Sequence, residues 1–93
     1  MLNFRVAIPS PLRSYCAGAS KVTIVCPTEF PTLGDLLGGL ESAYPGLRFR
    51  MQDEQGKLRP HIQVFVNAVV QRDPNAVLPP ESEVMIVAAL SGG

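Results

Sequence analysis

The carboxyl end of the sequence holds the strongest candidates for chemistry. Leu90 is followed only by Ser91, Gly92 and Gly93. Two glycines at this position cannot build a core, because glycine has no side chain to bury and loses the most conformational freedom when ordered. They do form a slender thread that can carry a terminal carboxylate into a narrow channel, where a Cβ would obstruct it. We therefore expect Gly93 to be the reactive residue, with the three preceding residues threading it; the alternative is a frayed terminus with incidental glycines.

The rest of the sequence contains no recognisable catalytic constellation. His61 is the only histidine, and Cys16 and Cys26 lack the spacing of metal ligands. We therefore expect no catalytic residue, no metal site and no bound cofactor. The two cysteines are interpreted as reduced thiols, and the alternatives are a disulfide or a catalytic thiol.

Composition narrows the class of protein. A chain of 93 residues is the size of one domain, so we expect a single domain over residues 1–93, with a flexible tail at 88–93. Lys plus Arg and Asp plus Glu both number 8, and this balance disfavours a nucleic-acid partner. No apolar run approaches the ~20 residues that span a bilayer, and the N-terminus lacks the pattern of a signal peptide. We expect a cytoplasmic protein with no membrane partner, monomeric when free.

Alternating apolar residues predict a set of strands. The stretches are residues 3–8, 21–26, 61–67, 69–72 and 83–90. Their inward residues are expected to be Phe4, Val6, Ile8, Val22, Ile24, Cys26, Ile62, Val64, Val66, Val84 and Ile86. Leu78 is expected to reach the core from a loop. The outward set includes Phe65, Met85 and Val87, which would form an apolar cluster on the outer face of the sheet. We expect this cluster to dock a partner, and the alternative is ordinary apolar surface.

One helix is predicted over residues 33–44. Its apolar stripe consists of Leu33, Leu36, Leu37 and Leu40. Thr32 and Asp35 have the spacing of a capping box, and Pro45-Gly46 stops the helix. A short helical turn is expected at 47–51, followed by an exposed loop through Gly56. Nearby lies a basic cluster, which we interpret as a solvated loop rather than a partner contact: Arg48, Arg50, Lys57 and Arg59.

These patterns alone indicate an α+β fold with a helix on a sheet. The joint order of several short motifs adds a resemblance to the MoaD/ThiS family of ubiquitin-like sulfur carriers. The motifs are Ile8-Pro9, Leu12-Arg13, Thr32-Leu33-Gly34-Asp35-Leu36, Tyr44-Pro45-Gly46, Phe65-Val66-Asn67, Glu83-Val84-Met85-Ile86 and Ser91-Gly92-Gly93. The loop through Gly56-Lys57-Leu58-Arg59 is most similar to the CysO-type carriers. The approach Val87-Ala88-Ala89-Leu90 departs from many carriers because it has no proline.

The resemblance implies a β-grasp (ubiquitin-like) fold, a mixed sheet of four to five strands with one main helix across it. The last strand would lie between the first and third and run parallel to the first. The resemblance also implies that an E1-like enzyme uses ATP to adenylate Gly93, and that a sulfur donor displaces AMP to leave a thiocarboxylate. The chain would then be a group carrier and not an enzyme, with covalent sulfur at Gly93.

The implied partners are the E1-like adenylating or sulfurtransferase enzyme and a sulfur-accepting synthase, in the biosynthesis of cysteine or a thio-metabolite. Alternatives stay open. The chain could be the small subunit of molybdopterin synthase, a ubiquitin-like modifier that forms isopeptides through Gly93, or a plain interaction domain. The sulfur acceptor, the activating enzyme, the sulfur donor and any trimming of the carboxyl end are not determined by the sequence.

Overall fold

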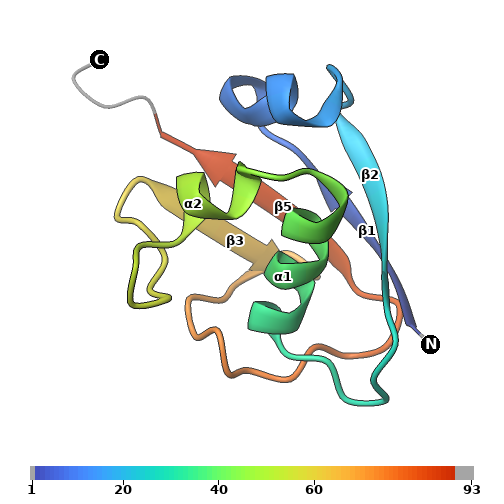
Figure 1. Cartoon of the computed structure of the whole chain (residues 1–93). Helices are drawn as coiled ribbons and strands as arrows, with labels where there is room; N and C mark the ends of the chain where they lie inside the picture. Colours follow the sequence, from blue (N-terminus) through green and yellow to red (C-terminus); the bar gives the residue numbers. More distant parts are fainter. Residues whose placement is uncertain (1, 90–93) are drawn as a thin grey trace.

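The computed structural model describes residues 2–89 (Figure 1). Along the chain, the elements are β1 (Leu2–Ala7), a 3-10 helix η1 (Ser10–Cys16), β2 (Lys21–Cys26), α1 (Leu33–Ala43), α2 (Leu47–Met51), β3 (Ile62–Val66), β4 (Val69–Val70) and β5 (Glu83–Ala88). All five strands form one sheet, and α1 packs across one face of it.

The strand order of the sheet is β2-β1-β5-β3-β4. The last strand therefore lies in the middle, parallel to β1 and antiparallel to β3. Val6 of β1 pairs with Val84 of β5, and Val64 of β3 pairs with Ile86 of β5. This is the β-grasp arrangement, so the expected α+β class, the mixed sheet and the central place of the last strand are confirmed.

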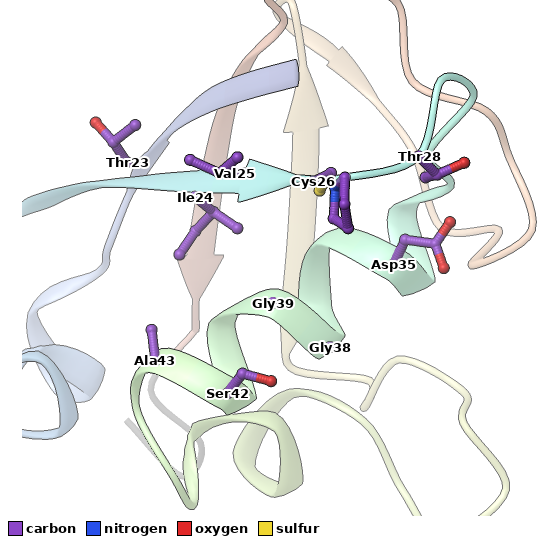
Figure 2. Close-up of a pocket in the computed structure, with 11 residues that line it drawn as sticks. Thr23, Ile24, Val25, Cys26, Thr28, Asp35, Gly38, Gly39, Ser42 and Ala43 are labelled. Carbon is purple, nitrogen blue, oxygen red and sulfur yellow. The ribbon is translucent and has the colours of Figure 1, made fainter. Parts of the chain in front are cut away.

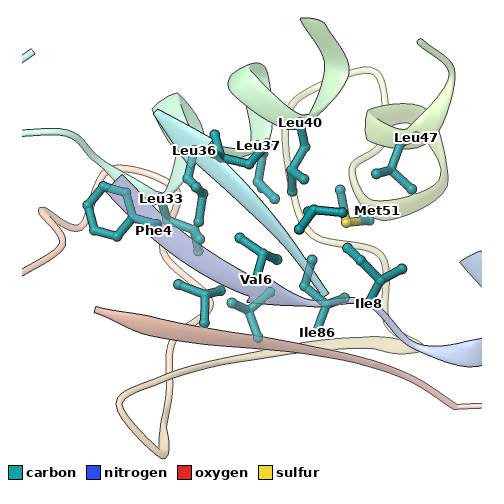
Figure 3. Packing of buried hydrophobic residues seen from close by; sticks show 14 of the residues in the cluster. Phe4, Val6, Ile8, Leu33, Leu36, Leu37, Leu40, Leu47, Met51 and Ile86 are labelled. Carbon is teal, nitrogen blue, oxygen red and sulfur yellow. The ribbon is translucent and has the colours of Figure 1, made fainter. Parts of the chain in front are cut away.

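The core lies between the sheet and α1 (Figure 3). The four leucines of the predicted stripe, Leu33, Leu36, Leu37 and Leu40, have no exposed surface. They meet alternate residues of the strands, among them Phe4, Val6, Ile24, Ile62, Val64 and Ile86. Leu78 is buried from its loop, as expected. Val66, expected to point inward, is only partly buried because it lies beside the short edge strand β4.

Local signals fix both ends of α1. The Asp35 amide donates to the Thr32 hydroxyl oxygen at 3.1 Å, and the Thr32 amide donates to the Asp35 carboxylate at 2.9 Å, which confirms the capping box. At the other end the Glu41 carboxylate accepts from the amides of Gly46 and Arg48, at 3.0 Å in each case. These bonds lower the pKa of Glu41 below its usual value and connect α1 to α2.

Gly39 marks the closest approach of α1 to the sheet. A Cβ built at this position would lie 2.7 Å from the Ile24 Cγ2 methyl of β2, well inside van der Waals contact. The neighbouring Gly38 is different, since its Cβ would meet only the Arg48 Nη1 atom at 3.5 Å. Gly39, and not Gly38, therefore allows α1 to pack closely on the sheet.

Two connections differ from expectation. Residues 10–16, for which no helix is predicted, form η1, with Leu12 and Cys16 buried. The loop predicted to be exposed through Gly56 also contributes to the interior, since Gln52 pairs with Leu58 and both are buried. The buried Gln52 amide is satisfied, because its nitrogen donates to the Gly56 carbonyl at 2.7 Å and its oxygen accepts from Arg48 Nε at 2.6 Å.

Candidate functional site at the end of the central strand

The central strand β5 leads the chain toward Gly93, and its hydrogen bonds show how far the backbone is held. Ala88 pairs with Ile62, and the Ala89 amide donates to the His61 carbonyl at 2.8 Å. The flexible tail predicted to begin at residue 88 is therefore wrong at its start, because Ala88 is a strand residue and Ala89 is still bonded. The remaining tail residues, Leu90, Ser91, Gly92 and Gly93, lie outside the described residues.

The backbone that holds Ala89 is itself clamped by Arg72. The Arg72 Nη1 atom donates to the Ile62 carbonyl at 2.6 Å, and Nη2 donates to the Leu58 carbonyl at 3.2 Å. These bonds fix the segment on either side of His61, and thereby the point where the chain leaves the sheet. Sequence reasoning missed this role, since nothing in the pattern around Arg72 shows which carbonyls it will meet.

On the face of the sheet opposite α1, apolar side chains form a row across four strands. Ala7 pairs with Met85, Met85 pairs with Phe65, and Phe65 pairs with Val70. We call these four residues the apolar row. Their side chains share one face because directly paired residues in a sheet point the same way. The row runs across the sheet near the middle of β5.

The row includes two of the three residues predicted to dock a partner. Phe65 is half-buried and Met85 is 46 % exposed, and the two are direct partners. Val87 shares this face but pairs with Gln63, one step further along the sheet. Sequence reasoning missed Ala7 and Val70, whose place in the row depends on the pairing of β1 and β4.

Charged residues border the apolar row on one side. Arg5 and Glu83 pair across β1 and β5, with Arg5 Nη2 at 2.7 Å from the Glu83 carboxylate. Both side chains are well exposed, so this ion pair adds at most about 1 kcal/mol to stability. A shallow hollow of about 420 Å³ lies here, lined in part by Arg5, Lys21, Phe65 and Met85. This face of the sheet thus combines an apolar centre with a charged border, as in many docking surfaces.

The predicted basic cluster is divided among separate local contacts. Arg50 donates to the Tyr15 hydroxyl, and its guanidinium lies 5.7 Å from the centre of the Tyr15 ring. Arg59 lies 4.8 Å from the centre of the Phe49 ring, and its Nε donates to the Phe49 carbonyl at 2.8 Å. Because the arginines are engaged within the chain, and Lys57 is exposed, the structure favours the solvated-loop interpretation over a dedicated cationic site.

The two cysteines are free and buried, as expected for reduced thiols. Burial raises the pKa of both thiols, and the Asp35 carboxylate raises the pKa of Cys26 further. A raised pKa lowers the thiolate fraction and with it the reactivity. Within residues 2–89, no group of His, Cys, Asp and Glu side chains is placed to hold a metal ion. The same part of the chain has no helix that is long and apolar enough to cross a membrane.

Neither a known family model nor a curated protein matches the sequence. Solved structures do match, over nearly the whole chain. CysO from Mycobacterium tuberculosis, described as an antigen, is 26 % identical with a TM-score of 0.81, over 94 % of this chain and 99 % of that one. CysO in the BexX/CysO complex of Amycolatopsis orientalis is 26 % identical with a TM-score of 0.82, over 97 % and 99 %.

SAMP1 from Haloferax volcanii is also 26 % identical, with a TM-score of 0.81, over 98 % of this chain and 99 % of that one. The full name of SAMP1 is small archaeal modifier protein 1, and a second structure of it from the same organism also matches. The expected resemblance is therefore confirmed: the structural neighbours of this β-grasp chain include ubiquitin-like sulfur carriers of the CysO and SAMP1 kinds, consistent with a MoaD/ThiS-type carrier.

Proposed function

We propose that the chain is a sulfur carrier that delivers sulfur as a thiocarboxylate on Gly93. The observation that carries the proposal is the path of β5. This strand occupies the centre of the sheet and keeps the backbone bonded through Ala89, four residues before Gly93. The similarity to CysO and SAMP1 over nearly the whole chain supports the same function.

The proposed chemistry needs a partner because a carboxylate is a poor electrophile. The Gly93 carboxylate attacks the α-phosphorus of ATP in an E1-like enzyme, which releases pyrophosphate and leaves an acyl-adenylate. A hydrosulfide ion then attacks the acyl carbon, AMP leaves, and the thiol proton passes to solvent. With a persulfide donor the product of attack is an acyl disulfide, and an external thiol reduces it to the same thiocarboxylate. The carrier supplies the acyl group and the partners supply the chemistry, so we infer that the chain is not itself an enzyme.

We further propose that the apolar row and Val87 form the docking surface for these partners. Met85, Val87 and Val70 are exposed by 46 %, 38 % and 51 %, which is unusual for neighbouring apolar side chains on one face. Methionine and aromatic side chains are typical of interface centres. The complex of BexX with a CysO supports the general idea that such carriers bind partner proteins. The acceptor would be a synthase that makes cysteine or a thio-metabolite.

The experiment that tests the proposal is the reaction of the purified chain with ATP, an E1-like adenylating enzyme and sulfide, followed by mass spectrometry. Replacement of one oxygen by sulfur adds nominally the same mass as oxidation of a methionine. The modification must therefore be localised to Gly93, by fragmentation or by alkylation of the thioacid. A thiocarboxylate at Gly93 supports the carrier. Formation of the acyl-adenylate without any thiocarboxylate, for several sulfur donors, would contradict it.

The SAMP1 neighbours favour a second candidate, a protein modifier, since SAMP1 is named as a modifier protein. Both functions share the activation of Gly93 and differ in the nucleophile that takes the acyl group. A lysine amine would give an isopeptide, with loss of AMP from the acyl-adenylate. High-molecular-weight conjugates in cells that disappear when Gly92 and Gly93 are deleted would support the modifier.

A further inference from the structure

The two edges of the sheet are very different. The β4 edge is only two residues long, Val69–Val70. The β2 edge is six residues long, Lys21–Cys26, and its five residues after Lys21 include no charge, no proline and no glycine. Proteins usually protect a regular edge strand with charges, prolines or bulges, because its free backbone groups pair readily with another strand. Apart from Lys21, the β2 edge lacks these devices.

The pairing of β2 with β1 shows which backbone groups are free. The Ile8 amide donates to the Ser20 carbonyl at 2.8 Å, which continues the antiparallel pairing of Ala7 with Lys21 by one residue. Residues that bond to β1 therefore alternate along β2 from Ser20 onward. The intervening residues, Lys21, Thr23 and Val25, direct their amides and carbonyls away from the sheet. The edge thus offers a ladder that an extended chain can complete.

A groove follows this edge on the side of α1 (Figure 2). It has a volume of about 670 Å³ and lies between β2 and the side of α1 formed by Gly38, Gly39, Ser42 and Ala43. Small residues at these positions leave room beside the strand. The Ile24 methyl that packs on Gly39 keeps the helix close to the sheet at the base of the groove. A side chain of Val or Ala size, pointing from an added strand toward α1, would enter this space.

One end of the groove is acidic. Asp35 lines it near Cys26, and Figure 2 shows its carboxylate at the same end of the groove as Thr28. Glu29 lies in the following loop and is exposed. No Lys or Arg lines the groove among the described residues. A partner segment with a cation at this end would therefore be favoured over an acidic one.

We propose that the β2 edge and this groove bind an extended segment of another protein as an additional strand. The segment has small apolar residues at alternate positions and a Lys or Arg beside Asp35. Its backbone bonds to Lys21, Thr23 and Val25 while its alternate side chains fill the groove, which is the mode of β-strand addition. A second copy of the chain is a less suitable partner. If its β2 edge paired with this one, the grooves of both copies would remain empty. The proposal is independent of any chemistry at Gly93.

The test uses the full chain labelled with ¹⁵N and a synthetic heptapeptide, Lys-Ser-Val-Ser-Val-Ser-Val, acetylated and amidated at its ends, in which the lysine shares one face of the strand with the valines. In antiparallel pairing its lysine lies beside Asp35. We expect saturable shifts of the amide signals of Lys21, Thr23 and Val25, with slower hydrogen exchange at these three. Alternate peptide amides face β2 in this arrangement, and the others face away from it. N-methylation of the amides that face β2 should weaken binding about tenfold or more, and N-methylation of the others should not. Equal effects of both sets would overturn strand addition.

Two variants of the protein sharpen the test. Thr23→Pro removes a free edge amide without removing a bond to β1, so it should weaken peptide binding while the fold, checked by circular dichroism, persists. Asp35→Asn keeps an oxygen for the helix cap and removes the charge; it should weaken the lysine peptide but not a peptide with serine in place of lysine. If the Thr23→Pro variant does not fold, the comparison of the two N-methylated peptides with the native chain still tests the proposal. The proposal would be overturned if no saturable shifts appear up to millimolar peptide, or if the shifts are confined to Phe65 and Met85. It would also be overturned if sedimentation shows that the chain forms dimers and that Thr23→Pro abolishes them.

Discussion

Phe65 on β3 and Met85 on β5 are direct cross-strand partners on the face of the sheet that α1 leaves uncovered. The pair lies at the middle of a row that begins at Ala7 and ends at Val70. Such pairs of an aromatic and a sulfur-containing side chain contact each other favourably. Met85 is exposed and Phe65 is half-buried, and together they form the centre of the proposed docking surface.

The first prediction concerns this surface. Met85→Asp should slow activation by the E1-like enzyme at least about tenfold, because it places a charge in the desolvated centre of the interface. The free energy of unfolding should change little, since Met85 is 46 % exposed. Single-turnover adenylation and chemical denaturation would measure the two effects. The matched control is Val69→Asp, which changes an exposed valine that is not part of the row. Equal rates for Met85→Asp and the native chain would contradict the docking role.

The second prediction concerns the last residue. Gly93→Ala should reduce thiocarboxylate formation strongly, by about a hundredfold, because the added Cβ obstructs the channel through which the tail reaches ATP. Thermal unfolding should be unchanged. Formation rates are followed by mass spectrometry, with Glu54→Ala, a change in an exposed loop, as the control. Normal turnover of Gly93→Ala would show that the tail does not enter a tight channel.

The third prediction compares the adjacent glycines of α1. Gly38→Ala should stabilise the fold by up to about 1 kcal/mol, because alanine is the better helix former and its Cβ meets only Arg48 Nη1 at 3.5 Å. Gly39→Ala should be less stable than Gly38→Ala by about 1–3 kcal/mol, because its Cβ would lie 2.7 Å from Ile24 Cγ2. Urea denaturation of both variants measures the difference. Equal stabilities would mean that α1 can move away from β2 at little cost.

The fourth prediction concerns the thiols. Burial raises the pKa of Cys16 and Cys26, so neither should react with iodoacetamide at neutral pH in the folded chain, whereas both should react in urea. Alkylation under native conditions would then report a thioacid at Gly93 with no background from cysteine. Rapid native labelling of Cys26, seen by peptide mapping, would show that β2 opens readily from the core.

The fifth prediction concerns pH. Hydrogen bonds from the amides of Gly46 and Arg48 lower the pKa of Glu41 in the folded state. The stabilisation from Glu41 is therefore fully present above its unfolded pKa of about 4.3 and is lost as the pH falls through the lower folded value. Glu41→Gln should lower Tm at pH 7, and the difference from the native chain should shrink in acid. A difference that is independent of pH would assign the effect to packing and not to charge.

Sequence reasoning succeeded for several features whose physical cause is local. The leucine stripe of α1, the capping box of Thr32 and Asp35, and the alternation along β1, β2 and β5 are all set by neighbours a few residues away, and each is confirmed. The order of the strands in the sheet could not be predicted from periodicity, and its prediction rested on the family resemblance.

Features that depend on contacts distant in the sequence were missed. Gln52 looks like a surface residue, and its burial follows only from the carbonyl of Gly56 and the side chain of Arg48. The clamp by Arg72 depends on carbonyls ten or more residues away. Helix η1 was missed because Pro9 and Pro11 suggest a break, whereas proline is well suited to a first helical turn. The end of β5 at Ala88 could not be found either, because apolar residues continue to Leu90.

The hydrogen bond from Ala89 to His61 is the last backbone bond that holds β5 to the sheet among residues 2–89. Gly93 is four positions beyond Ala89, and a fully extended chain covers at most ~3.6 Å per residue, which gives a reach of about 14 Å. An enzyme that acts on Gly93 must bring its reactive atoms within this distance of the end of the sheet, and so must lie almost against the carrier. To reach a deeper active site, the chain would have to break the bonds of β5 to β3, beginning with those at His61 and Ile62. The depth of a partner's channel therefore determines how many strand residues must separate from the sheet.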